Sequence, residues 1–442
     1  MSQNNMTEDE ALSALMSYVF SGGLGAPTGG DAGYSLIEAT PTSFSWSVAL
    51  DGGEEPSAHP DRYRINIDRK SGQITSPGPI AISETEQAQA IASATGQTLT
   101  SSTRFLDGAH SISYKVSVEE NPDIAYLIHL RHHGNVASME SLITRLLRTP
   151  QAVNQNALPI PAFFPIPGER ERQESTGLGR QISLFVPGVL ASTIYPNLSH
   201  EDKLVFIRKV ALAFSASWNI SLPDPIMIGG LHATTVDDNI ILDVQAERHH
   251  GFGGPFLSVR EYLESYVKAS FRALEKQQGI EEFKKKYLKR IGNFVRTRLH
   301  KISSIVEDVP IVVLHSNMGP HNIIVSSDEP TTFKAIIGWT YVASEPFLAV
   351  NRTVEAYFRE PALNGFGPEY DKANELREAF WGTIPYWRRW GETDASHVFR
   401  EWFRFGLFMK PEGRPADLPE AESQAFWSEN VRVVEDFLDR YE

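Results

Sequence analysis

A polar loop between two apolar runs holds the residues of this chain that are best suited to chemistry. Residues 311–314 read as a buried strand, and residues 323–325 begin a second one. Between them lie His315, Asn317 and Asn322, whose side chains are polar and mostly uncharged near pH 7. Because the loop has no carboxylate, its composition favours recognition of neutral groups or proton transfer through imidazole.

The loop resembles the corresponding region of the aminoglycoside phosphotransferase and choline kinase-like families, the small-molecule relatives of protein kinases. Those families carry His-x-Asp-x-x-x-x-Asn, then strand, turn and strand, then an Ile-Ile-Asp-Trp-like stretch. Here His315, Asn317 and Asn322 take the loop positions, and Gly338 and Trp339 take the Asp-Trp positions. The resemblance implies an α+β, protein kinase-like two-lobed fold, with a strand-rich small lobe and a helical large lobe.

Other stretches carry the same resemblance. Residues 106–116, which include Gly108, look like the hairpin that covers the nucleotide phosphates. His129 stands in the third strand, where the family has a basic residue, and Glu140 stands where the family has its carboxylate partner. Two later stretches are similar to a fungal branch of the family, residues 364–370 and 402–408.

The chain divides into three predicted parts. Residues 1–98 form an N-terminal extension, in which alternating polar and apolar residues predict strands near 34–50 and 62–75. Residues 99–188 form the small lobe, with the nucleotide-type hairpin and a hinge at its end. Residues 189–442 form the helical large lobe, which contains the degenerate catalytic loop.

Local signals place the helices. Ser83 and Glu86 form a capping box and predict a helix that closes at Gly96. Beyond residue 199 we expect mainly helices, with a strand pair at 311–314 and 323–337. The expected long helices are at about 200–218, 257–277, 280–305, 372–382, 396–408 and 420–440.

Departures from the family pattern decide which chemistry is implied. The family's loop aspartate handles the proton of the attacking hydroxyl, but Asn317 has no useful basicity. The family's second aspartate binds magnesium, but Gly338 has no side chain. His129 is mostly neutral near pH 7 unless its pKa is raised. General-base help is worth about 10²–10⁴-fold, and charge stabilisation is usually the larger contribution. Ordinary magnesium–ATP phosphotransfer is therefore disfavoured.

Three functions stay open. The first is a repurposed small-molecule enzyme of secondary metabolism that needs neither metal nor cofactor and performs cyclisation or isomerisation. The second is a non-catalytic binding or scaffold protein, a pseudokinase. The third is a residual phosphotransferase that uses ATP and Mg. The candidate catalytic residues are Asn317, His315, His129 and Glu140, and the candidate ligand-binding residues are Asn322, Trp339, Gly338 and Gly108. His315 also has a structural alternative, in which it only bonds the backbone near the loop.

The amino-acid composition limits the classes of molecule that this chain is expected to bind. Forty-one Lys and Arg against 55 Asp and Glu give a net charge of −14, which disfavours nucleic acid and anionic membranes. The absence of cysteine excludes disulfides and thiolate sites. No long apolar run or secretory signal is evident, so we expect a soluble cytoplasmic protein. The expected partner is a neutral or apolar small molecule.

Overall fold

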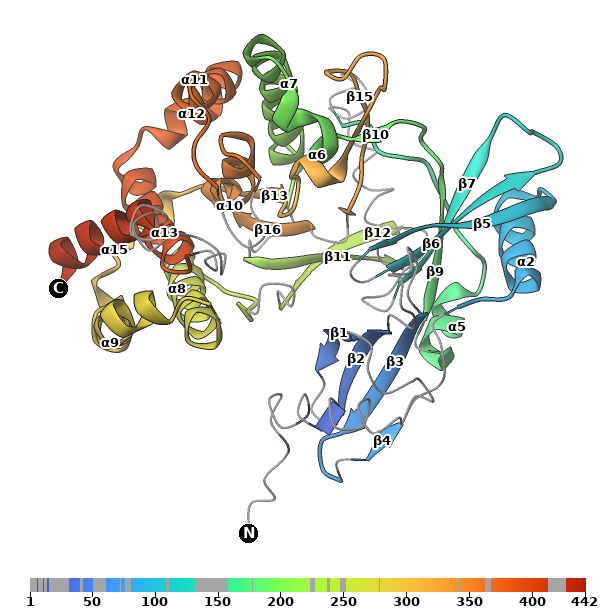
Figure 1. Cartoon of the computed structure of the whole chain (residues 1–442), viewed down its shortest axis with the longest axis horizontal. Coiled ribbons are helices and arrows are strands. Elements are labelled where there is room, and N and C mark those ends of the chain that lie inside the picture. Colours follow the sequence, from blue (N-terminus) through green and yellow to red (C-terminus); the bar gives the residue numbers. More distant parts are fainter. Residues whose placement is uncertain are drawn as a thin grey trace. The chain divides into compact units, whose positions relative to one another are not determined.

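The chain, seen here as a computed structural model, divides into two units, and Figure 1 labels their helices and strands. Unit 1 comprises Met1–Glu140 and Pro161–Phe185, and unit 2 comprises Ser141–Ile160 and Val186–Glu442. The structure describes residues 6, 11, 14–15, 32–39, 43–50, 61–71, 73–75, 81–108, 111–131, 158–176, 178–222, 227–236, 239–246, 252–277, 279–339, 342–361, 367–411 and 427–442. The three-part division of the chain, with a separate extension over residues 1–98, stays a prediction.

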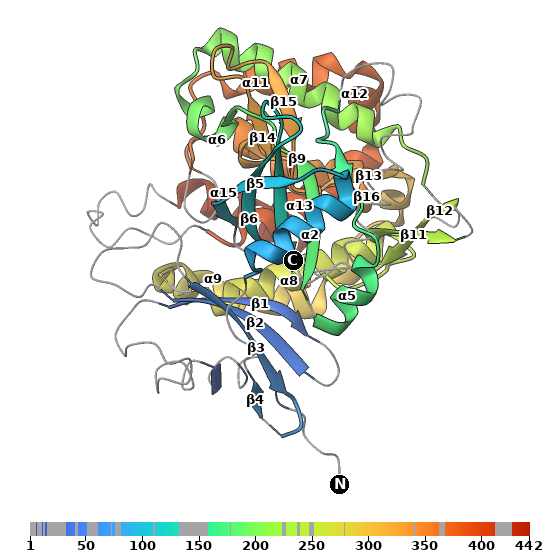
Figure 2. The same ribbon diagram turned by 90° about the vertical axis from the view of Figure 1, so that its right-hand side faces the viewer.

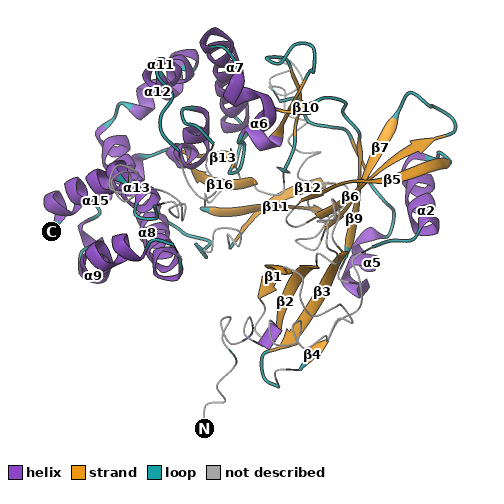
Figure 3. Ribbon diagram, viewed as in Figure 1, coloured by secondary structure: helices purple, strands orange, loops and turns teal. Residues whose placement is uncertain are grey.

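Unit 1 is built from two antiparallel sheets, drawn in orange in Figure 3. The first has the order β1-β2-β3-β4, with bounds Ala32–Ala39, Ser43–Leu50, Asp61–Asp68 and Ile74–Thr75. These strands confirm the alternation seen near residues 34–50 and 62–75. The second sheet has the order β5-β6-β7-β9-β8. Its strands are β5 Leu99–Gly108, β6 Ser111–Val118, β7 Ala125–Arg131, β8 Phe163–Phe164 and β9 Gly179–Leu184.

Alternation along these strands separates an apolar face from a polar one. Ile112, Ile128 and Ile182 belong to the buried core of the unit, to which helix α2 (Glu84–Thr95) contributes Ile91. The helix has the expected capping box at Ser83 and ends at Gly96, whose φ is +72°. Helix α5, Glu169–Thr176, also belongs to this unit.

Unit 2 is mainly helical (Figure 2). Its longer helices are α7 His200–Trp218, α8 Val259–Lys276, α9 Glu281–Thr297, α11 Ala373–Thr383, α12 Pro385–Gly391, α13 Asp394–Phe408 and α15 Ser428–Tyr441. Its short helices are α6 Ala191–Ile194, η1 Tyr195–Asn197, η2 Leu299–Lys301, η3 Ser304–Asp308, η4 Pro320–Asn322, η6 Phe347–Val350, α10 Asn351–Val354 and η7 Glu355–Tyr357. The α+β class expected from the sequence is confirmed: one unit is strand-rich and the other helical.

Two small antiparallel sheets also lie in unit 2. One has the order β10-β14-β15, with bounds Val189–Leu190, Ile323–Val325 and Phe333–Ile336. The other has the order β12-β11-β16-β13, with bounds Asn239–Gln245, Gly229–Val236, Val342–Pro346 and Ile311–His315.

The second sheet corrects the sequence prediction of a single strand pair. The β11–β12 hairpin was not expected, and β13 pairs with β16 rather than with the strands after the loop. Strand β16 was missed because its sequence has no apolar run: it contains Ser344 and Glu345, and both are buried. A buried ion pair between Glu345 and Arg352 compensates that polarity. The predicted helix at 280–305 is also shorter, because α9 ends at Thr297 and two 3₁₀ turns follow.

No helix in the described ranges is both long enough and apolar enough to cross a membrane.

Candidate functional site

The polar loop of unit 2 is positioned by the strands on either side of it. Strand β13 ends at His315, the short helix η4 closes the loop at Asn322, and β14 follows directly. Strands β14 and β15 are antiparallel neighbours, with Ile323 opposite Ile336. The Ile337 N–H then donates to the Asn322 carbonyl over 2.9 Å. This register places Gly338 beside Asn322, sixteen residues away in sequence.

His315 uses both ring nitrogens within the backbone around the loop. Its Nε2–H donates to the Ile337 carbonyl over 2.9 Å, and its Nδ1 accepts the Asn317 N–H over 3.2 Å. The imidazole is fully buried and meets the Trp339 ring edge-on, with 4.9 Å between ring centroids. Burial lowers the pKa of His315 to about 4, so the ring is neutral near pH 7. This arrangement favours the structural role that the sequence left open.

Three side chains tie the loop to itself. The Asn322 Nδ2–H donates to the Asn317 carbonyl over 2.8 Å. The His321 Nε2–H donates to the Asn317 Oδ1 over 3.0 Å. His321 is exposed at the loop surface, yet neighbouring atoms desolvate its ring and lower its pKa. Sequence analysis did not single out His321. Its place four residues after Asn317, in the same short loop, is the signal that points to the pair.

Gly338 and Trp339 have different surroundings. Gly338 has φ +77°, a conformation that side chains disfavour, and a Cβ there would lie 2.8 Å from the Cγ, Oδ1 and Nδ2 of Asn322. The Trp339 side chain is in the core of unit 2, and its Nε1–H donates to the Ile336 carbonyl over 2.7 Å. The carboxamide of Asn322 therefore fills the space that a side chain at position 338 would need.

Buried hydroxyl groups donate hydrogen bonds to the backbone of the loop. Thr353 Oγ1–H donates to the Ser316 carbonyl over 3.0 Å, and the Tyr357 O–H donates to the Met318 carbonyl over 2.8 Å. The Tyr195 O–H donates in turn to the Tyr357 carbonyl over 2.7 Å. Such satisfied buried bonds fix a loop conformation without placing a charge in it.

The other predicted site residues belong to unit 1 or lie outside the described ranges. His129 lies on the polar face of the five-stranded sheet, where its Nδ1 is 2.9 Å from Ser113 Oγ and its Nε2 is 3.4 Å from Ser183 Oγ. Gly108 ends β5 opposite Ser111. Glu140 lies outside the described residues.

The structure thus brings five predicted residues together in unit 2: His315, Asn317, Asn322, Gly338 and Trp339. Their assigned roles in catalysis or ligand binding stay predictions. Within the described ranges, no group of three His, Asp or Glu side chains is arranged to hold a metal ion.

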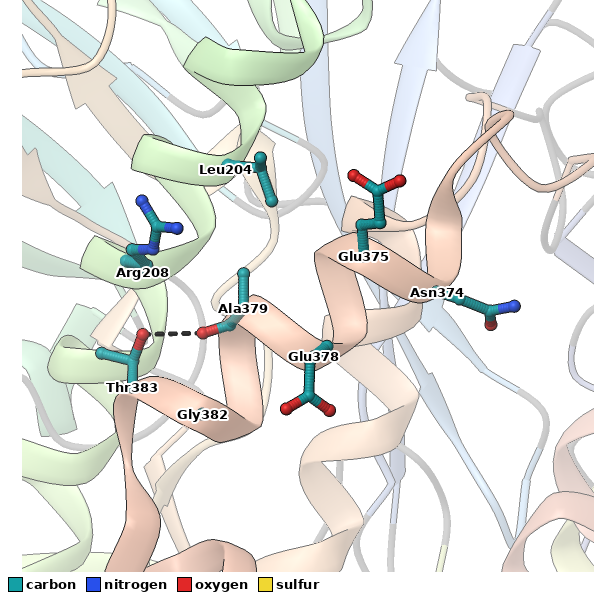
Figure 4. Close-up of a pocket in the computed structure, with 8 residues that line it drawn as sticks. All are labelled: Leu204, Arg208, Asn374, Glu375, Glu378, Ala379, Gly382 and Thr383. Carbon is teal, nitrogen blue, oxygen red and sulfur yellow. Dashed lines mark hydrogen bonds between the residues drawn. The ribbon is translucent and has the colours of Figure 1, made fainter.

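A separate open groove of about 570 Å³ runs between α7 and α11, two helices that lie side by side in unit 2 (Figure 4). It is lined by Leu204, Arg208, Asn374, Glu375, Glu378, Ala379, Gly382 and Thr383. Both carboxylates are engaged, Glu375 with His200 at 2.8 Å and Glu378 with Arg388. No residue of the polar loop lines this groove.

Comparison with solved structures finds phosphotransferases of the aminoglycoside and macrolide types. A thermostable mutant of aminoglycoside phosphotransferase APH(4)-Ia is 13% identical, over 80% of this chain and 98% of that one, with a TM-score of 0.44. Macrolide 2'-phosphotransferase type I is 13% identical, over 82% and 98%, with a TM-score of 0.43. The gentamicin complex of APH(2")-IIa is 11% identical, over 80% and 97%, with a TM-score of 0.44. No family model and no curated protein sequence matches the chain.

Proposed function

We propose that this chain is a kinase-like small-molecule enzyme that acts on a neutral ligand without metal or ATP, by chemistry such as cyclisation or isomerisation. The observation that carries the proposal is the contact between Gly338 and Asn322. A side chain at position 338 would collide with the Asn322 carboxamide at 2.8 Å, and the backbone there is left-handed. Both features oppose a carboxylate at the position where the resemblance implies one.

A magnesium–nucleotide does not fit this set of donors. Magnesium prefers carboxylate oxygens in near-octahedral geometry. Position 317 offers an amide instead of a carboxylate, and position 338 offers no side chain at all. Phosphoryl transfer depends on positive charge around the transferring group, and residues 315–322 contain no lysine or arginine.

The neutrality of the loop also indicates the class of ligand. Its imidazoles have lowered pKa values because of desolvation, and its other polar groups are amides and hydroxyls. Placing an unpaired charged ligand in such surroundings costs several kcal/mol, whereas a neutral ligand avoids that penalty. A neutral or apolar small molecule is therefore the expected partner.

A thermal-shift screen of the full chain tests the proposal. Neutral metabolites are compared with ATP and GTP, each with and without magnesium. We expect neutral compounds to raise Tm and magnesium–nucleotides to leave it unchanged. The Asn317→Ala variant should weaken a neutral hit at least tenfold in calorimetry. Asn293→Ala, at an exposed position of α9, is the matched control and should bind like the wild type.

Two outcomes would contradict the proposal. Micromolar nucleotide binding that weakens on chelation of magnesium would support the residual phosphotransferase. Neutral hits that bind Asn317→Ala as well as they bind the wild type would support a scaffold with no use for this loop.

A further inference from the structure

We propose that His321 is the proton acceptor of this loop, held by Asn317 so that its Nδ1 lone pair is left for the substrate. The inference rests on the proposed function and makes it specific. The substrate class is a neutral small molecule with an acidic C–H or O–H bond. Asn317 is a positioning residue in this arrangement and takes no proton itself.

The hydrogen bond to Asn317 decides which ring nitrogen is protonated. An amide oxygen can only accept, so the 3.0 Å contact between His321 Nε2 and Asn317 Oδ1 puts the hydrogen on Nε2. A neutral imidazole has one N–H, so Nδ1 then keeps its lone pair. No described residue donates a hydrogen bond to that Nδ1.

The absence of a side chain at Gly319 leaves the space that the His321 ring occupies. A Cβ at position 319 would lie 2.7 Å from the His321 Cε1 and 2.9 Å from its Nδ1, closer than real contacts allow. The backbone of Gly319 has φ −85° and ψ 174°, a conformation that any residue adopts. The turn itself therefore does not need a glycine here. The position of the His321 ring does need a glycine, because the ring lies where a Cβ of residue 319 would be.

Other candidate bases near the loop are already engaged. His315 has both nitrogens bonded to backbone groups and is fully buried. Glu345 is 1% exposed and forms an ion pair with Arg352 at 3.1 Å. It also accepts a hydrogen bond from the Ser316 Oγ–H over 3.4 Å. Within the described loop, His321 is thus the basic side chain that combines exposure with an unused nitrogen.

The proton-transfer step balances within the site. The substrate X–H bond breaks, its electron pair stays on X, and the proton moves to His321 Nδ1. The ring becomes an imidazolium, and its Nε2–H···Oδ1 bond to Asn317 becomes charge-assisted and stronger. Return of the proton to a different atom of the substrate completes an isomerisation and restores the neutral ring without any co-reactant.

The first test is the protonation pattern of the ring in the full chain. Nitrogen-15 NMR of imidazoles, with the His321 signals assigned by His321→Gln, should show hydrogen on Nε2 and none on Nδ1 at pH 7.5. Asn317→Asp should keep this pattern, since a carboxylate also accepts from Nε2. Hydrogen on Nδ1 in the wild type would overturn the proposal.

The second test is the reactivity of the lone pair toward diethyl pyrocarbonate, which acylates unprotonated imidazole nitrogen. At pH 6, peptide mass spectrometry should find His321 modified several-fold faster than exposed His300, the internal reference. Gly319→Ala should slow modification of His321 at least threefold and leave His300 unchanged, because the added methyl group displaces the ring. Equal rates for His321 in wild type and Gly319→Ala would overturn the proposal.

A neutral hit from the thermal-shift screen separates the two proposals. Protection of His321 from acylation by that compound supports both. A compound that raises Tm and depends on Asn317 but leaves His321 fully reactive sinks the base assignment and leaves the proposed function standing. Nucleotide binding that requires magnesium sinks the proposed function, whatever the state of His321.

Discussion

Two regions of unit 2 treat charge in opposite ways. The loop over residues 315–322 has no charged side chain at neutral pH, and its polar groups bond to one another, to nearby backbone or, for the Ser316 hydroxyl, to Glu345. The ion network around Arg359 holds three carboxylates, two from nearby in the sequence and one from 70 residues away. Their oxygens lie 2.6–3.0 Å from the guanidinium: Glu355, Glu369 and Glu429.

The carboxylates of this unit thus have a structural use at Arg359 that the loop lacks. At Arg359 they fasten helix α15, through Glu429, to the segment around Glu355. The hydrogen bond from Arg377 holds the pKa of Glu369 below its usual range. A carboxylate placed in the loop would find no Lys or Arg side chain among residues 315–322 to pair with. We therefore expect substitutions in the charged network to change mainly the free energy of unfolding, and substitutions in the neutral loop to change mainly ligand binding.

The largest effect should come from breaking the network. Arg359 is 3% exposed, so Arg359→Ala removes the buried cation that the three carboxylates share and leaves them only the more exposed Arg377 and Arg404. We expect a loss of about 3–5 kcal/mol in the free energy of unfolding, measured by urea denaturation at pH 7. Arg432→Ala removes an exposed pair with a 4.0 Å separation and should cost at most about 0.5 kcal/mol. Similar losses in both variants would mean that the network carries little energy.

The next effect concerns His315 and pH. Its folded pKa of about 4 lies below the ordinary 6.5, so the unfolded chain binds more protons between those values. Its contribution is complete above pH 6.5 and is lost as the pH falls toward 4, on the order of 3 kcal/mol in total. Between pH 7 and 4, the wild type should lose that much more stability than His315→Gln. The exposed control His300→Gln should follow the wild type, and parallel profiles for wild type and His315→Gln would contradict the burial argument.

A smaller effect should separate backbone strain from crowding at Gly338. Gly96 and Gly338 both have positive φ, but a Cβ at Gly96 meets nothing within 4 Å. Gly96→Ala should therefore cost only the left-handed backbone, about 1–2 kcal/mol. Gly338→Ala should cost more, and the excess should shrink by about 0.5 kcal/mol or more in an Asn322→Ala background. Urea denaturation of the four variants measures this coupling. If Gly338→Ala cost no more unfolding free energy than Gly96→Ala, the Asn322 side chain would have to move aside without cost.

The smallest expected effect is that of Asn317→Asp. The new carboxylate accepts from His321 Nε2–H, so it should raise the pKa of His321 above its wild-type value. The change in unfolding free energy should stay within about 1 kcal/mol, because the pair is near the surface. Proton NMR titration of His321 gives the pKa. An unchanged or lower value would show that Asn317 and His321 are not partners in solution.

Sequence reasoning succeeded where the signal is local. The capping box at Ser83, the helix end at Gly96 and the bounds of α7 follow from hydrogen bonds and periodicity within a few residues. It failed for β16, whose Ser344 and Glu345 are buried. The burial of Glu345 depends on Arg352, a partner that alternation of residues does not reveal.

The same division holds at the candidate site. The order of residues is enough to show that the loop carries amides and imidazoles in place of carboxylates. The contacts between those residues come from the fold. The register of β14 against β15 sets the Asn322 carboxamide against Gly338, and the loop turn sets His321 against Asn317 and Gly319. Composition and spacing are properties of the chain, whereas a close contact or a free lone pair depends on backbone geometry that forms only when the strands pair.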